Sequence, residues 1–274
     1  MSRVHDHNRR AWDERVRRQE SYTATATEPQ FKNPLAVIDQ CGWLGDVSGR
    51  RVLCLAAGGG KQGPLYAAAG AIVTVVDLSP NMLELDRQVA AERKLKIETV
   101  EASMDDLSMF GEASFDLVVQ PVSTCYVPDV ERVYQQVARV AVSGGLYISQ
   151  HKQPVNLQAD AFPSARGYVL NEPYHRTGPL PPVPAGTANR ESGTLEFLHR
   201  WEQLLGGLCR NGFVIEDVAE PRHADPKAEP GTFGHRSCYV PPYIKIKARR
   251  RSEAASESAI RKILLGPRDG RQSS

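Results

Sequence analysis

The sequence lacks the features that mark membrane, secreted and strongly charged proteins. Its 274 residues contain no run of about 18 apolar residues, so we expect no membrane-spanning helix and no membrane partner. The first 20 residues have no apolar core, which argues against a secretory signal peptide. The net charge is only +2, so no overall field favours nucleic acid as a partner. We therefore expect a cytoplasmic protein.

Clustered metal ligands and paired cysteines are also lacking. The five cysteines are an odd number and include no CxxC pair, which favours reduced thiols over a disulfide framework or a zinc site. His5 and His7 have no third ligand close to them in the sequence. We therefore predict no metal site.

What the sequence does contain is the composition and patterning of a globular α/β protein. Hydrophobic residues make up 41% of the chain and charged residues 24%, near the averages for globular domains. Between residues 50 and 150, apolar runs without polar alternation are separated by amphipathic segments. Such runs are typical of strands covered on both faces, and strands joined by helices form a parallel sheet. The predicted strands are 51–58, 71–78, 95–100, 115–121 and 146–150, and the predicted helices are 61–69, 80–90 and 130–140.

The remaining segments differ from this pattern. We expect residues 1–49 to form an N-terminal helical segment and residues 50–250 to form the main domain. The main domain is interrupted at 151–193 by a proline-rich stretch without periodicity, which we interpret as an inserted lid. Residues 251–274 are expected to form a flexible tail.

The end of the main domain shows periodicity again. Apolar residues at helical spacing predict an amphipathic helix over 195–208. Two strands are predicted after it, at 213–218 and 243–248. The second alternates apolar and basic residues, so one of its sides is expected to face water.

The most informative motif is a glycine turn at the end of the first buried strand, VLCLAAGGGKQG at residues 52–63. Glycine lets the backbone turn sharply and approach a ligand closely, and the amides at the next helix start attract negative charge. Asp77 ends the next strand, 19 residues after Gly58. Because the ends of adjacent parallel strands lie side by side, a carboxylate there can bind the ribose hydroxyls of an adenosine.

This motif fits two kinds of cofactor. Gly58, Gly60 and Gly63 match the GxGxxG spacing of dinucleotide sites, so a nicotinamide-dependent oxidoreductase is one interpretation. An enzyme that uses adenosylmethionine is the other. A phosphate-binding loop is disfavoured because Lys61 is not followed by Ser or Thr in the required frame.

Five segments follow one another in the order VLCLAAGGG (52–60), VVDLSPNML (75–83), EASMDDL (101–107), FDLVVQPVS (115–123) and VAVSGGLYIS (140–149). Together they resemble the class I S-adenosylmethionine-dependent methyltransferases, and more narrowly the small-molecule enzymes of the type-11 kind. The resemblance implies a Rossmann-like, doubly wound sheet of seven strands, mostly parallel, that ends in an antiparallel hairpin. It also implies S-adenosyl-L-methionine as cofactor, with the N-terminal segment covering the cofactor site.

The resemblance also implies roles for single residues. Asp77 would bind the ribose, Leu78 would lie beside the adenine, and Ser103 stands where the family often has an aspartate near the adenine amine. Ala56 replaces the usual first glycine of the loop. The other implied cofactor positions lie on the glycine loop, beside the adenine, at the end of the fourth strand and in the N-terminal segment: Gly58, Gly60, Met104, Gln120 and Tyr22.

Methyl transfer from a sulfonium is an in-line displacement on an activated donor, so the protein mainly aligns the reactants and excludes water. A base is needed only where the acceptor must lose a proton. The candidate catalytic residues are His151, after the fifth strand, as a base, and Tyr126, after the fourth, as a residue that would shape the pocket. We expect a small-molecule acceptor. The alternatives are the nicotinamide-dependent oxidoreductase and a catalytically inactive adenosylmethionine-binding regulatory protein.

Overall fold

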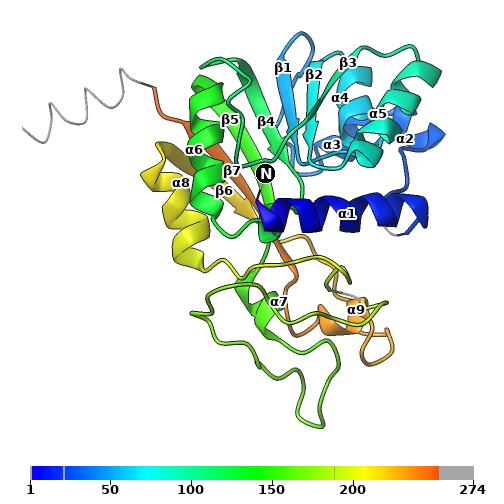
Figure 1. Cartoon of the computed structure of the whole chain (residues 1–274), viewed down its shortest axis with the longest axis vertical. Helices are drawn as coiled ribbons and strands as arrows, with labels where there is room; N and C mark the ends of the chain where they lie inside the picture. The colour runs from blue at the N-terminus through cyan, green and yellow to red at the C-terminus, as the bar shows by residue number, and fades with distance from the viewer. Residues whose placement is uncertain (1, 21, 188, 253–274) are drawn as a thin grey trace, which may run out of the picture.

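The strands of this chain form one mixed sheet. A computed structural model describes residues 2–20, 22–187 and 189–252, and these contain a seven-stranded sheet in the order β3-β2-β1-β4-β5-β7-β6 (Figure 1). Neighbouring strands are parallel from β3 to β5, whereas β7 runs antiparallel to β5 and β6. This confirms the predicted sheet and its C-terminal hairpin. The strands are β1 (Arg51–Leu55), β2 (Ile72–Asp77), β3 (Ile97–Glu101), β4 (Phe115–Gln120), β5 (Ala141–Lys152), β6 (Phe213–Ala219) and β7 (Tyr243–Arg250).

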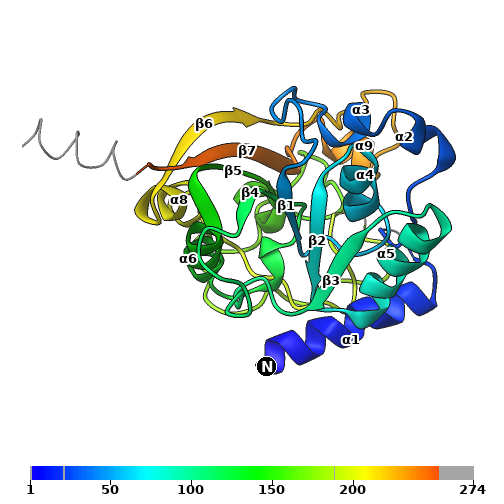
Figure 2. The same cartoon turned by 90° about the horizontal axis from the view of Figure 1, so that it is seen from above.

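Helices cover both faces of the sheet, as Figure 2 shows from above. Leu53 and Leu55 of β1 pack on the face under α6 and α8, whereas Val52 and Cys54 pack on the opposite face under α4 and α5. Neighbouring residues of a strand point to opposite faces, which explains why these strands are apolar at every position. These helices are α4 (Gln62–Ala68), α5 (Pro80–Glu92), α6 (Val130–Val140) and α8 (Gly207–Arg210).

Two segments outside the sheet lie at the carboxyl ends of its parallel strands. Helix α1 (Arg3–Arg17) lies between the sheet and a loop-rich layer that contains α7 (Pro154–Gln158) and α9 (Phe233–Arg236) (Figure 1). This layer has an apolar cluster of its own, made by Leu157, Leu180 and Leu198. The N-terminal part also contains α2 (Glu28–Lys32) and α3 (Pro34–Ile38).

Two predicted elements were wrong in their extent. Strand β5 begins at Ala141, not at residue 146, and continues to Lys152, so the Gly144–Gly145 pair lies within it. The predicted helix over 195–208 begins only near Trp201, with a π-helical turn at Glu202–Gly206 before α8.

The residues before Trp201 are extended because their backbone bonds to distant loops. Phe197 donates its N–H to the Cys125 carbonyl at 2.7 Å, and the Glu196 carbonyl accepts from Leu180 at 2.7 Å. The periodicity of Leu195 and Leu198 therefore reflects burial in the loop-rich layer. The predicted tail lies outside the described residues from 253 onward.

Candidate functional site

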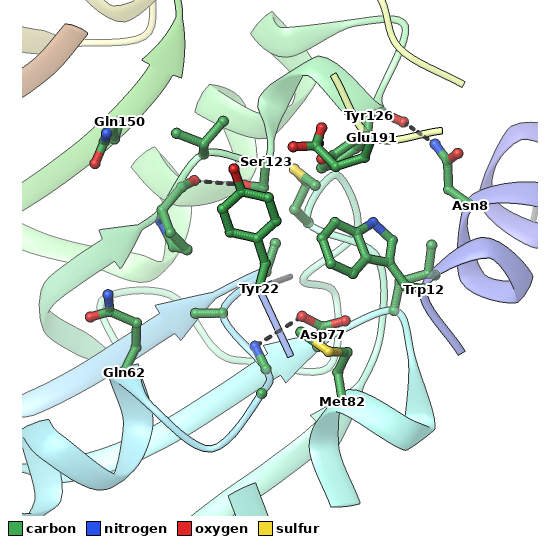
Figure 3. Close-up of a pocket in the computed structure, with 18 of the residues that line it drawn as sticks. Asn8, Trp12, Tyr22, Gln62, Asp77, Met82, Ser123, Tyr126, Gln150 and Glu191 are labelled. Carbon is green, nitrogen blue, oxygen red and sulfur yellow. Dashed lines mark hydrogen bonds between the residues drawn. The ribbon is translucent and has the colours of Figure 1, made fainter. Parts of the chain in front are cut away.

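A cavity of about 450 Å³ opens beyond the carboxyl ends of β1, β2 and β4. Its walls come from α1, from the loops that follow these strands, and from single residues of β5, β7 and the insertion. Figure 3 shows Asp77 and Met82 on one side of it, the Tyr126–Glu191 pair on another, and Trp12 and Tyr22 between them. The side that contains Asp77 is called the cofactor side below, and the side that contains Tyr126 is called the acceptor side.

The glycine turn brings the end of β1 against the Asp77 carboxylate. A Cβ atom on Gly58 would lie 2.8 Å from the Met82 Cβ and 3.0 Å from the Asp77 Cγ, so only glycine fits there. The Gly58 amide donates to Asp77 Oδ2 at 2.9 Å. Ala56, Gly58 and Gly59 all line the cavity, as the loop residues nearest to a bound ligand would.

Asp77 is placed to accept further hydrogen bonds. Its second carboxylate oxygen, Oδ1, accepts the Ser79 amide at 2.9 Å. The Leu78 amide also stabilises this carboxylate, so backbone amides use part of its acceptor capacity and the remainder is left for hydroxyl groups in the cavity. Desolvation at this wall raises the pKa of Asp77 to about 6, although the amides of Ser79 and Gly58 stabilise the charged form.

A second carboxylate, Asp86 on α5, holds the same turn from behind. Its Oδ2 accepts the Gly59 amide at 2.9 Å, and the side chain is fully buried. Burial raises the pKa of Asp86 to about 7. Asp86 was not among the residues predicted from the sequence. The sequence did contain a sign of its role, because Asp86 lies on the same face of α5 as the buried Leu83, Val89 and Ala90.

The cofactor side of the cavity is completed by residues after β2 and β3. Leu78, Ser103 and Met104, which the resemblance places near the adenine, line it. The Ser103 hydroxyl lies 3.3 Å from the His5 Nε2 of α1. That histidine also lies 3.3 Å from the Asp105 carboxylate. Helix α1 is therefore anchored at the edge of the site.

Helix α1 is anchored a second time close to Asp77. The Ser79 hydroxyl, which caps α5, donates to Asp13 Oδ1 at 2.6 Å. The Asn8 side chain reaches the other way and donates to the Tyr126 carbonyl at 2.9 Å. Trp12 lies between these two residues in the helix and packs edge-on against the Tyr126 ring, with centroids 5.6 Å apart. Nothing in the local pattern of α1 predicted these contacts.

Two predicted cofactor residues do not line the cavity. An added Cβ on Gly60 would meet Thr25 and Val89, and its carbonyl accepts the Ala26 amide at 3.0 Å, so this glycine packs against the N-terminal segment. Gln120 is buried behind the wall. Its Nε2 donates to Ser123 Oγ at 2.9 Å, and it is Ser123, three residues after the strand end, that lines the cavity.

His151 does not have the surroundings of a catalytic base. It is buried within β5, where Nδ1 contacts Thr124 Oγ1 at 2.8 Å and Nε2 contacts Ser149 Oγ at 2.7 Å. Burial lowers the pKa of His151 to about 3. It does not line the cavity, whereas its neighbour Gln150 does. The interpretation of His151 as a base is therefore corrected.

The acceptor side is built around a buried ion-pair network. The Tyr126 hydroxyl donates to Glu191 Oε2 at 2.8 Å, and both residues line the cavity. Lys152, which is fully buried, donates to Glu191 at 2.6 Å and to Glu196 at 2.8 Å. Arg190 pairs with Glu196 at 2.6 Å. The two cations and two carboxylates balance, so this network presents no excess charge to the cavity.

Aromatic side chains form the rest of the acceptor side. Tyr22 has a left-handed backbone conformation, with φ at 72°, and its side chain is 59% exposed at the cavity edge. Tyr243 at the start of β7 also lines the cavity, and burial, together with the nearby Tyr22 side chain, raises its pKa. With Trp12 and Tyr126 they give this side mainly flat apolar walls.

Neither a metal-binding cluster nor a membrane-spanning helix was found where the chain is described. Residues 2–20, 22–187 and 189–252 contain no group of three or more His, Cys, Asp or Glu side chains able to hold a metal ion. Within the same ranges no helix is long and apolar enough to cross a membrane.

Comparison with known proteins agrees with this geometry. Residues 53–149 match the family model described as a methyltransferase domain. An uncharacterized methyltransferase of Bacillus subtilis, YbaJ, is 33% identical over 236 residues, which cover 81% of this chain and 92% of that protein. A ubiquinone biosynthesis O-methyltransferase of Bordetella pertussis is 32% identical over 124 residues, but these cover only 43% of this chain and 51% of that enzyme.

Solved structures show the same fold. An S-adenosylmethionine-dependent methyltransferase from Mesorhizobium loti superposes with a TM-score of 0.62 at 26% identity, covering 76% of this chain and 94% of that one. Magnesium protoporphyrin IX methyltransferase from Synechocystis, solved with bound SAH, superposes with a TM-score of 0.56 at 15% identity, covering 90% and 97%. The second likeness concerns the fold alone.

Proposed function

This chain belongs to the class I S-adenosylmethionine-dependent methyltransferases, and we propose that it transfers the methyl group to a small-molecule acceptor by in-line displacement. One observation carries the proposal: the close approach of Gly58 to Asp77 at the wall of a cavity that also has an aromatic acceptor side. Family membership removes the nicotinamide-dependent interpretation of the glycine turn. The spacing of Gly58, Gly60 and Gly63 had left that interpretation open.

The residues of the cofactor side fit an adenosine with an attached amino acid. Asp77 keeps acceptor capacity for ribose hydroxyls, and Leu78 and Met104, which both line the cavity, offer apolar surface to an adenine ring. Ser103 provides a hydroxyl at the same end. The loop Ala56–Gly59 borders the space left for the amino-acid part, and Tyr22 covers it from the N-terminal segment.

S-Adenosylmethionine, when bound, supplies a methyl group that its sulfonium charge has already activated. The protein then has to align the acceptor and exclude water. Trp12, Tyr22, Tyr126 and Tyr243 form apolar walls for this purpose. The Tyr126 hydroxyl donates a hydrogen bond to Glu191. Its oxygen can therefore still accept a hydrogen bond from an O–H or N–H group of the methyl acceptor.

The charge balance of the acceptor side favours an uncharged acceptor. Lys152 neutralises Glu191 and is itself occupied by this pair, so it is not available there to bind an anionic group. Tyr126 is no ready base either, because burial and the adjacent Glu191 raise its pKa well above the usual range. The residues of this side therefore position the acceptor and do not act as a general base.

The insertion and α1 close the acceptor side together. The insertion contributes Glu191 to the cavity wall. Helix α1 is tied to the chain that follows, because Asn8 Oδ1 accepts the Leu195 amide at 2.7 Å and Arg15 donates to the Ser192 carbonyl at 3.2 Å. This supports a lid role for residues 151–193 and a covering role for residues 1–49.

The direct test is to follow labelled methyl groups from the cofactor into an extract that has been separated by size. We expect label in compounds of the low-molecular-mass filtrate, and none above background in retained protein or nucleic acid. The Asp77→Ala chain, assayed with the same extract, gives the background. Label found only in macromolecules would contradict the small-molecule acceptor and leave the cofactor assignment intact.

A further inference from the structure

Two carboxylates, on opposite sides of the glycine turn, accept hydrogen bonds from successive amides of the turn. Gly58 donates to Asp77 at 2.9 Å, and Gly59 donates to Asp86 at 2.9 Å. Asp77 lies at the cavity wall, while Asp86 lies behind the turn. A proton gained or lost by either carboxylate therefore acts on the backbone that a bound cofactor touches.

Neither carboxylate has a cationic partner within residues 2–20, 22–187 and 189–252. Asp86 faces Cys54 from β1, Asp77 from β2, and Arg87 of its own helix. The Arg87 guanidinium is turned to the surface, where it binds Glu84 at 2.9 Å. Asp77 in turn faces Asp13 from α1. In the described part of the chain, the hydrogen bonds given for these three acids come from amide and hydroxyl donors.

The contrast with the other buried charges of the molecule is informative. Lys152, Glu191, Glu196 and Arg190 form a balanced network on the acceptor side. Burying an unpaired carboxylate costs free energy, and this cost falls when a positive charge comes near or a proton is bound. Asp77 and Asp86 thus lack an ion-pair partner that a cationic ligand would supply, although Lys61 also lines this side of the cavity.

The methyl donor and its product differ in this property. S-Adenosylmethionine carries a sulfonium, an ammonium and a carboxylate, so it is a cation, whereas S-adenosylhomocysteine lacks the sulfonium charge and is neutral overall. Both share the same adenosine and amino-acid groups. If the two ligands shift the pKa values of Asp77 and Asp86 by different amounts, the difference therefore arises from the charge at the sulfur atom.

We propose that Asp86 is a positioning residue for the cofactor. We further propose that Asp77 and Asp86 together release a fraction of one proton per site when the cationic methyl donor binds. This inference rests on the cofactor site of the proposed function. Asp86 keeps the glycine turn in its binding shape, and the pair favours the charged donor over the neutral product as pH increases.

The direction of the effect follows from linkage. Burial raises the pKa of Asp77 to about 6 and that of Asp86 to about 7, so both carboxyls are partly protonated near neutral pH. A nearby cation favours the ionised form and lowers both pKa values, which expels protons. Affinity for the donor therefore rises with pH between about 6 and 8, more steeply than affinity for the product.

Calorimetric titration in two buffers of different ionisation enthalpy measures the released protons. At a pH near 7 we expect S-adenosylmethionine to release about 0.3 proton more per site than S-adenosylhomocysteine. Asp86→Asn keeps an oxygen for the Gly59 amide, so affinity for the product should stay within about threefold, while most of the excess release is lost. Glu84→Gln, an exposed acid on the same helix, should behave as the unmodified chain does.

Each outcome decides the inference. Equal proton release for both ligands would overturn the coupling, and an undiminished excess in Asp86→Asn would overturn the part assigned to Asp86. If Asp86→Asn does not fold, the pH dependence of the two affinities in the unmodified chain still tests the coupling. If neither ligand binds, the cofactor site itself is wrong, which distinguishes failure of the proposed function from failure of this inference.

Discussion

The two sides of the cavity are assembled in opposite ways. The cofactor side comes from short segments at the ends of neighbouring strands, with Gly58 and Asp77 only 19 residues apart. The acceptor side joins residues that are far apart in the chain, such as Trp12, Tyr126, Glu191 and Tyr243. A binding site made by adjacent strand ends leaves a local signature in the sequence. A site made by distant loops leaves none.

The two sides also treat charge differently. The acceptor side contains a balanced network in which Lys152 bonds to two glutamates, whereas the cofactor side contains carboxylates held only by backbone amides and hydroxyls. Variants on the acceptor side should therefore act first on stability. Variants on the cofactor side should act first on ligand affinity.

The largest effect is expected for Lys152→Met. Removing the ammonium leaves Glu191 and Glu196 buried without their shared partner, and breaking such a pair costs about 3–5 kcal/mol of unfolding free energy. Chemical denaturation measures this loss. Arg210→Met, which removes an exposed pair with Glu131, is the control and should cost at most about 1 kcal/mol. Similar costs for the two variants would show that the buried network is not a stability element.

Asp77→Ala is expected to have the largest effect on binding. Loss of charge-assisted hydrogen bonds to the ribose should weaken S-adenosylhomocysteine binding by about 1.5–3 kcal/mol. Titration calorimetry gives this value directly. The exposed Asp106→Asn, on the loop after β3, provides a matched control without an expected change. An unchanged affinity in Asp77→Ala would place the ribose elsewhere.

Gly58→Ala tests the close approach on the same side. The added methyl group would lie 2.8 Å from the Met82 Cβ, so the turn or α5 must shift, at a cost of about 1–3 kcal/mol in unfolding free energy. We also expect weaker product binding, because the shift displaces the Asp77 carboxylate. At Gly111, by comparison, the nearest atom to an added Cβ is 3.6 Å away, and Gly111→Ala should be tolerated. If Gly58→Ala and Gly111→Ala have the same unfolding free energy and product affinity, the close approach at Gly58 does not exclude a side chain.

Tyr126→Phe is expected to have the smallest effect and the most selective one. It removes one hydrogen bond to Glu191, worth about 0.5–1.5 kcal/mol of stability, but Lys152 still pairs with that carboxylate. Affinity for S-adenosylhomocysteine should not change. Calorimetry together with denaturation tests both statements. A strong loss of product binding would mean that Tyr126 belongs to the cofactor side and that the division of the cavity is drawn in the wrong place.

The features that could be predicted share local causes. The strands were visible because a sheet covered on both faces needs apolar residues at every position. Gly58 and Asp77 followed from the turn between strand and helix. Leu78, Ser103 and Met104 followed from the resemblance, and all three line the cavity.

The residues that could not be predicted depend on the tertiary structure. Strand β5 continues to Lys152, so alternation turns Gln150 to the cavity and leaves His151 among Thr124 and Ser149. Asp86 interrupts an apolar helix face, but its role needs the Gly59 amide from another element. Glu191 lies in an irregular insertion without periodicity, and only the fold brings it to Tyr126.

A crystal structure with S-adenosylhomocysteine bound tests the assignment of the two sides most directly. We expect both ribose hydroxyls within hydrogen-bond distance of the Asp77 carboxylate, the adenine between Leu78 and Met104, and the sulfur facing the side formed by Tyr126 and Glu191. A nucleoside bound away from Asp77, or a sulfur turned from the aromatic walls, would contradict this assignment.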